Sequence, residues 1–170
     1  EDIKKLMDIE TPKKLDNVTT FINGSVRELC SAVSRECSKY GYEPVMLTDQ
    51  LCCQAKEAGS FLASIAKTHC KSGKKLAYIA GGETAAEGIK GMSNAAVFSI
   101  GSDGTDGPTD AAGGYSDGDT AGVLKNKGID IFEVLKNNDA YNALKLTEGL
   151  IITGPTGTNV NDVSVLLISD

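Results

Sequence analysis

The sequence predicts an α/β fold in which flanking helices and a mostly parallel sheet form three layers (α/β/α). Two observations carry this prediction. In the first half of the chain, short apolar segments of strand length alternate with amphipathic segments of helix length, and parallel neighbouring strands need connections of that length. In addition, polar, glycine-rich segments directly follow three apolar segments, as ligand-binding loops do at strand ends in α/β proteins.

The first half is expected to contain three strands with a helix in each connection. Apolar residues recur at helical spacing in the first helix, and Gly41 stands where a glycine commonly ends a helix. Thr48 and Asp49 are candidate N-cap residues for the second helix. The expected elements are a strand over 18–22, a helix over 26–40, a strand over 42–47, a helix over 51–68 and a strand over 76–80.

The second half is less regular and is expected to contain shorter elements. Gly128 is placed to end one short helix, and Asn138 or Asp139 to cap another. The expected elements are strands over 95–100, 150–152 and 163–168, and helices over 120–127, 131–136 and 139–146.

Composition and charge disfavour several classes of protein. The net charge is −6, and the 17 Lys and Arg residues are spread too thinly for the basic face of a nucleic-acid-binding protein. No apolar run reaches the ~18 to 20 residues that a membrane-spanning helix needs. The N-terminus shows neither an initiator Met nor a signal peptide, so we expect the chain to come from the middle of a longer polypeptide.

The cysteines form no recognisable metal or disulfide pattern. There are five of them, an odd number, and none belongs to a C-x-x-C pair. We therefore expect reduced thiols in a cytoplasmic protein. The residues concerned are Cys30, Cys37, Cys52, Cys53 and Cys70.

Carboxylates crowd the polar segment that follows the strand over 95–100. Asp103, Asp106 and Asp110 lie within eight residues, in a stretch from 91 to 123 that contains no Lys or Arg. Crowded carboxylates repel one another, and hard oxygen ligands suit Mg²⁺ or Mn²⁺, so we predict a metal site at these three residues. The alternative is that each Asp caps a turn through its own backbone.

A second polar segment, residues 154–162, follows the strand over 150–152. It offers hydroxyl and amide side chains and flexible glycines but no positive charge, so backbone N–H groups are its means of holding a phosphate or carboxylate. The alternative is a plain turn between two strands. Gly82, Glu83 and Thr84 form a comparable but weaker candidate loop. The candidate residues of the second segment are Thr156, Gly157, Thr158, Asn159 and Asn161.

Several well-known catalytic motifs are missing from the sequence. There is no Walker loop and no G-x-G-x-x-G dinucleotide fingerprint. No G-x-S-x-G elbow is present, and the single histidine, His69, is expected at a helix end on the surface rather than as a catalytic base.

Four motifs, in order, closely resemble the C-terminal signatures of the glycerate 2-kinase family, the MOFRL-type family whose members often carry the older name hydroxypyruvate reductase. They span residues 81–84, 101–113, 137–141 and 153–162, and the resemblance extends over nearly the whole chain. It implies a two-lobed α/β enzyme that uses ATP and Mg²⁺ to phosphorylate D-glycerate at O2, giving 2-phosphoglycerate.

The resemblance also implies an organisation and a set of partners. Residues 1–16 would be a linker or a detached helix, 17–80 a βαβ segment, and 81–170 the MOFRL-type C-terminal domain. The partners would be D-glycerate, ATP and the N-terminal lobe, without which we expect little or no activity; a homo-oligomer stays open. The implied substrate-binding or phosphate-binding residues extend to Thr109, Asn138 and Asp139.

One departure from the family stands between Gly91 and Met92. Family members follow the Gly-Gly-Glu-Thr strand with a glycine-rich stretch bearing Gly-Gly-Arg-Asn-Gln-Glu and a helix, which this sequence lacks. We expect that a segment is missing here, either deleted or omitted from the sequence. Two other functions stay open: an NAD(P)H-dependent hydroxypyruvate reductase, and a non-catalytic regulatory or docking module.

Overall fold

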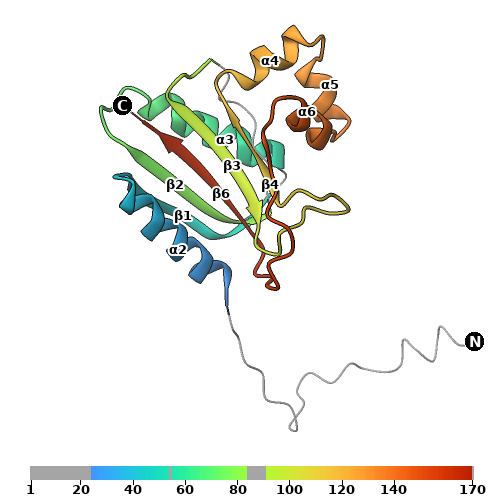
Figure 1. The fold of residues 1–170 in the computed structure, drawn as a ribbon. Coiled ribbons are helices and arrows are strands. Elements are labelled where there is room, and N and C mark those ends of the chain that lie inside the picture. Colours follow the sequence, from blue (N-terminus) through green and yellow to red (C-terminus); the bar gives the residue numbers. More distant parts are fainter. Residues whose placement is uncertain (1–23, 54, 84–90, 170) are drawn as a thin grey trace, which may run out of the picture.

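Six strands form one sheet in the computed structural model, which describes residues 24–53, 55–83 and 91–169 (Figure 1). The sheet order is β1-β2-β6-β3-β4-β5. The strands are β1 (Glu43–Cys52), β2 (Leu76–Glu83), β3 (Ala95–Gly101), β4 (Gly113–Asp117), β5 (Leu150–Ile151) and β6 (Asp162–Ile168). The helices are α2 (Val26–Lys39), α3 (Ala55–His69), α4 (Thr120–Asn126), α5 (Ile131–Lys136) and α6 (Ala140–Leu146).

The α/β class is confirmed, but the expectation of a mostly parallel sheet is wrong. Only β1 and β2 pair in parallel, whereas the β2–β6, β6–β3, β3–β4 and β4–β5 pairs are antiparallel. These pairings make β1, β2, β3 and β5 point the same way, with β6 and β4 inserted in the opposite direction. The alternation of strands and helices in the first half therefore indicated the parallel β1–β2 pair, but neither the opposite direction of β6 nor strand β4 was expected.

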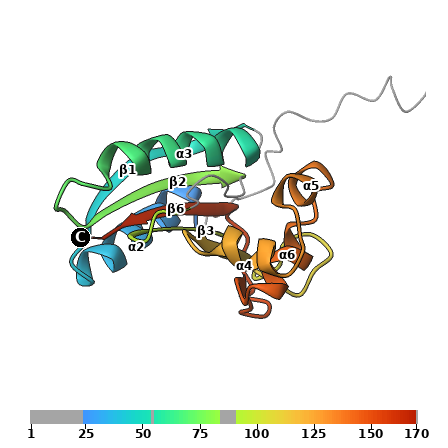
Figure 2. The same cartoon turned by 90° about the horizontal axis from the view of Figure 1, so that it is seen from above.

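The central strand, β6, is buried on both faces. Leu166 and Ile168 belong to the core beneath α3, whereas Val163 and Val165 belong to the core beneath α2. The two helices cover opposite faces of the sheet (Figure 2). A strand buried on both sides has a nearly continuous apolar sequence rather than an alternating one, as the run 163–168 has apart from Ser164.

The first helix matches the expectation closely, and the strand after it does not. Ser25 caps α2 by accepting a hydrogen bond from the Glu28 amide, and Gly41 follows the helix with φ 81°. Strand β1, however, continues to Cys52, so Thr48 and Asp49 lie inside it and do not cap α3. Irregular pairing with β2 on both sides of Thr48 lets the strand extend.

Asp49 has a structural role instead. Its carboxylate accepts a hydrogen bond of 2.6 Å from Arg27 Nε, which ties β1 to α2. This hydrogen bond lowers the pKa of Asp49. His69 is the last residue of α3, as expected, and its ring centroid lies 5.6 Å from that of Tyr78.

The remaining expectations have mixed outcomes. Helices α4, α5 and α6 lie within one or two residues of their expected bounds, and all five cysteines are free thiols. The expected segment 1–16, the strand over 18–22 and Thr84 lie outside the described residues. Among the helices that the structure describes, none combines the length and apolar character needed to cross a membrane.

Candidate functional site

Two polar loops lie side by side at one edge of the sheet. They are residues 102–112, which follow β3, and residues 152–161, which join β5 to β6; we call them the paired loops. The Thr156 amide donates to the Asp103 carbonyl oxygen at 3.0 Å, and the Thr156 hydroxyl donates to the carbonyl oxygen of Ser102. These hydrogen bonds bring together two of the three polar segments that directly follow apolar segments in the sequence.

Ser102 is the main link between the paired loops. Besides accepting from Thr156, it accepts at Oγ from the Val160 amide at 2.8 Å and donates its own amide to the Asn161 carbonyl oxygen at 3.1 Å. One residue therefore holds the second loop at three points, and the two loops form one unit.

Glycine permits the close approach of the two backbones. Gly104 has φ 86°, and a Cβ there would lie 2.0 Å from the carbonyl oxygen of Gly154. No side chain fits at that distance, and the left-handed conformation disfavours other residues. The run of glycines that marked this loop in the sequence is thus explained in part by contact between the loops.

The three predicted metal ligands are not gathered into one cluster. Asp103 Oδ1 accepts from the Thr105 amide at 3.0 Å, and Asp110 Oδ1 accepts from the Tyr141 hydroxyl at 2.7 Å. Within the described ranges, no three acidic, His or Cys side chains gather in a way that would hold a metal ion. Asp103 stabilises its own turn and Asp110 is turned toward α6, so the carboxylates are not gathered here, and a metal role for Asp103, Asp106 and Asp110 stays a prediction.

A smaller set of oxygen atoms does converge, at Gly101. The position that a Cβ would take there lies 3.0 Å from the Thr105 carbonyl oxygen and 3.2 Å from Oδ1 of both Asp103 and Asp162. Two carboxylates and a carbonyl suit Mg²⁺, which is commonly held by one or two protein carboxylates and completed by water and substrate phosphates. Asp162 ends the polar segment 154–162 but was not singled out from the sequence, because it lies far along the chain from the acidic cluster.

Asp117, farther along the same cation-free stretch, has a structural role. Its Oδ1 accepts from the amides of Asp119 and Thr120 and from the Thr120 hydroxyl, at 2.9 to 3.0 Å. Burial alone would raise the pKa of Asp117, but these hydrogen bonds together outweigh burial and lower that pKa. The carboxylate fixes the turn from β4 into α4.

Several predicted phosphate ligands stabilise their own loops. The Thr109 hydroxyl donates to the Asp106 carbonyl oxygen at 2.8 Å, and Asn159 Oδ1 accepts from the Asn161 amide at 3.2 Å. The Thr158 amide donates to Thr156 Oγ1 at 3.4 Å, and Gly157 turns the loop with φ 75°. The second loop therefore has a fixed shape, which a binding loop needs.

The remaining candidates lie on other elements. Asn138, with φ 53°, and Asp139 precede α6, and Asp139 Oδ1 accepts from Asn142 Nδ2 at 2.6 Å. Gly82 and Glu83 end β2 opposite Leu51 and Cys52. Within the described part of the chain, the hydrogen bonds of Asn138 and Asp139 do not extend to the paired loops, whereas Tyr141 of α6 donates to Asp110.

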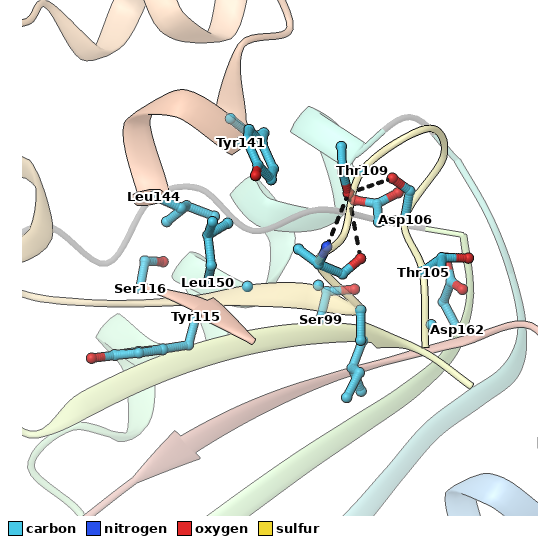
Figure 3. Close-up of a pocket in the computed structure, with 17 residues that line it drawn as sticks. Ser99, Thr105, Asp106, Thr109, Tyr115, Ser116, Tyr141, Leu144, Leu150 and Asp162 are labelled. Carbon is cyan, nitrogen blue, oxygen red and sulfur yellow. Dashed lines mark hydrogen bonds between the residues drawn. The ribbon is translucent and has the colours of Figure 1, made fainter. Parts of the chain in front are cut away.

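A cavity of about 120 Å³ lies beside the paired loops, between β3, β4 and α6 (Figure 3). Its lining includes Thr105, Asp106 and Thr109 from the first loop and Asp162 from β6. Tyr141 and Leu144 project toward it from α6. The sequence placed Tyr141 in the motif 137–141 without assigning it a role. Its hydrogen bond to Asp110, which is 31 residues away along the chain, shows that it contacts the first of the paired loops.

Comparison with known proteins identifies close relatives. The MOFRL family profile matches residues 59–162. The D-glycerate 2-kinase of Thermotoga maritima is 42% identical over 191 aligned positions, covering 99% of this chain and 46% of the relative. The glycerate 2-kinase of Pyrococcus horikoshii is 38% identical, covering 94% of this chain and 42% of the relative. An Agrobacterium vitis protein that carries the provisional name hydroxypyruvate reductase is 31% identical, covering 89% of this chain and 48% of the relative.

Solved structures give the same picture. The crystal structure of a glycerate kinase from Thermotoga maritima matches 99% of this chain with a TM-score of 0.80 and 42% identity, using 46% of its own length. A second structure, from Pyrococcus horikoshii, matches with a TM-score of 0.78 and 34% identity. The chain thus spans less than half the length of these relatives.

Proposed function

Because this chain belongs to the MOFRL family, we propose that it forms part of a glycerate 2-kinase, which transfers a phosphate from ATP to O2 of D-glycerate and gives 2-phosphoglycerate. The observation that carries the proposal is the union of the paired loops at one edge of the sheet, through Ser102 and Thr156. Relatives named as glycerate 2-kinases support the choice of reaction.

The second of the paired loops is proposed to bind a phosphate or carboxylate group. Its hydroxyls, amide side chains and backbone N–H groups are the donors available there, and its shape is fixed by the first loop. Gly82, Glu83 and Thr84 are proposed to contribute further ligand groups. The proposed ligand residues of the second loop are Thr156, Gly157, Thr158, Asn159 and Asn161.

Asp103 and Asp162 would hold Mg²⁺ at Gly101, where their oxygen atoms converge. When bound, the ion would neutralise negative charge on the phosphates of ATP. Gly101 keeps the space between the two carboxylates open, because a Cβ would fill it.

The absent half of the enzyme is proposed to supply the cations. Phosphoryl transfer relies on positioned Lys, Arg or metal ions, yet residues 91–123 and 146–170 contain no Lys, Arg or His. The alignment with the Thermotoga maritima enzyme extends over 191 positions although this chain has 170 residues, so at least 21 positions have no counterpart here. This difference supports a missing segment, which we place between Gly91 and Met92.

The proposal is tested by complementation. The chain is mixed with the part of the Thermotoga maritima D-glycerate 2-kinase that it does not match, and ADP release is measured with ATP and D-glycerate. We expect no turnover by the chain alone and measurable turnover by the mixture, which Asp162→Asn abolishes and Asp119→Asn leaves intact. Robust turnover by the chain alone would refute the dependence on a second lobe.

A second candidate, an NAD(P)H-dependent hydroxypyruvate reductase, is favoured by the provisional name of the Agrobacterium vitis relative. The sequence lacks the G-x-G-x-x-G fingerprint that holds a dinucleotide pyrophosphate. Titration of the chain with NADH, followed by NADH fluorescence, separates the two functions: tight binding supports the reductase and no binding supports the kinase.

A further inference from the structure

The cavity between β3, β4 and α6 exists because small residues meet there. A Cβ at Gly114 would lie 2.4 Å from Cδ1 of Leu144, so α6 packs directly against the backbone of β4. Ala111 and Ala112 are buried next to this contact, and Ala140 begins α6. Figure 3 shows the resulting hollow beside the first of the paired loops.

The lining of the cavity carries negative and neutral groups only. Asp106 and Asp162 contribute carboxylates, and none of the described residues that line the cavity is Lys, Arg or His. The neutral part of the lining includes Ser99, Leu144 and Leu150. An anionic phosphate or carboxylate inside the cavity would have no cation from these residues to balance its charge.

Two hydroxyls that line the cavity already donate their protons to other groups of the chain. The Tyr141 hydroxyl already donates its proton to Asp110 Oδ1 at 2.7 Å, which leaves its oxygen as an acceptor. The Thr109 hydroxyl likewise donates to the Asp106 carbonyl oxygen. The exposed carboxylate of Asp106 only accepts. Tyr141 and Asp106 therefore offer acceptor oxygens to a ligand that brings hydrogen-bond donors and no negative charge.

The size of the cavity limits further which ligands can fit into it. At about 120 Å³ it is smaller than the ~300 Å³ at which pockets for drug-sized ligands begin. A whole nucleoside does not fit, but one small hydroxylated group does. Carboxylates bind neighbouring hydroxyls of this kind, as the acidic residue of dinucleotide-binding folds binds ribose.

We propose that this cavity binds an uncharged vicinal diol, with Asp106 and Tyr141 accepting hydrogen bonds from its hydroxyls. The proposal deepens the proposed function and rests on it for the source of the diol: the ribose of ATP or the two hydroxyls of D-glycerate. In either case the charged end of the substrate lies outside the cavity, toward the paired loops and Gly101.

The test is an NMR titration of the 170-residue chain, read at the amide signals of Thr105, Gly113 and Gly114. The probes come in pairs that differ in the diol: adenosine against 2′,3′-dideoxyadenosine, and D-glycerate against D-lactate. We expect one diol probe to shift these signals while its partner lacking the diol does not. The pair that responds identifies the source as ribose or glycerate.

Variants at two lining residues test whether the probes bind in the cavity. Asp106→Asn and Tyr141→Phe should each weaken the binding of the responding probe about tenfold, a change worth about 1.4 kcal/mol in binding free energy. Asp119→Asn makes the same charge change at an exposed residue preceding α4 and should leave the affinity for the probe unchanged. Chemical shifts elsewhere in the chain report whether each variant is folded, and Tyr141→Phe retains the ring.

The outcomes separate this inference from the kinase proposal. Equal shifts with both members of each pair, no shift with any diol, or cavity shifts caused by inorganic phosphate alone would each overturn the diol site. None of these requires turnover, so the diol site can fail while the complemented enzyme still phosphorylates D-glycerate. Conversely, diol binding with no turnover after complementation would retain the site and reject the reaction.

Discussion

The two halves of the sheet, β1, β2 and β6 on the one hand and β3, β4 and β5 on the other, are stabilised in different ways. Strands β1, β2 and β6 lie between α2 and α3, where residues such as Ile79 and Leu166 are fully buried in apolar cores. Around β3, β4 and β5, the paired loops depend on glycines, hydroxyls and backbone hydrogen bonds. We infer that apolar burial provides most of the stability around β1, β2 and β6, which we call the apolar region. The part around β3, β4 and β5, which we call the loop region, has less apolar burial and instead presents a polar surface of fixed shape.

The largest effect is expected in the apolar region. Leu166 is completely buried beneath α3, so Leu166→Ala should lower the free energy of unfolding by about 3 to 4 kcal/mol, through lost burial and the cavity left behind. Leu146→Ala removes the same atoms from a side chain that is 43% exposed, and should cost well under half as much. Urea unfolding measures both. Equal losses would mean that the two regions do not differ in this way.

A backbone change should have the next largest effect, in the loop region. Gly104→Ala requires the paired loops to separate, because the new Cβ would meet the Gly154 carbonyl oxygen, and we expect a loss of about 2 to 3 kcal/mol. Gly107→Ala is the matched control: φ is 57°, but nothing lies within 4 Å of the new Cβ, so only the backbone cost of about 1 kcal/mol applies. Urea unfolding of both variants gives the difference, and similar losses would show that contact between the loops is unimportant.

A side-chain change within the paired loops should cost less still. Ser102→Ala removes the acceptor of the Val160 amide and should lower the free energy of unfolding by about 1 kcal/mol. Its effect on the complemented enzyme should be larger than this loss suggests, seen as a raised KM, because Ser102 positions the second loop. Ser64→Ala, at an exposed hydroxyl of α3, is the control and should change neither quantity. An unchanged KM in Ser102→Ala would argue that the second loop binds no substrate.

The sequence predicts the apolar region better than the loop region, for physical reasons. Helical spacing and strand-length apolar runs report burial directly, which is why α2 and β6 lie close to their expected bounds. Which strands pair depends on contacts distant in sequence, so the insertion of β6 between β2 and β3 could not be foreseen.

The candidate site shows the same limit. Clustered carboxylates indicate a polar loop, but the direction of each side chain depends on distant partners, as the contact between Asp110 and Tyr141 shows. Asp162 approaches Asp103 only because the strand that it begins lies next to β3. Motif recognition singled out the two loops that the structure joins, whereas the side chains that converge within them follow from the fold.

The smallest expected effect concerns the acid sensitivity of the turn into α4, at the border of the two regions. Hydrogen bonds lower the pKa of Asp117 in the folded chain, despite the opposing effect of burial, so its ionised form stabilises the fold above the unfolded pKa of about 3.9. That contribution is lost as the pH falls through the folded pKa. Asp117→Asn should therefore flatten the decline in unfolding free energy below about pH 4, which urea unfolding across that range measures. Asp119→Asn, whose side chain makes no capping hydrogen bond, should keep the wild-type slope. If Asp117→Asn also kept it, the acid sensitivity would have to come from other carboxylates, and the turn would not depend on charge.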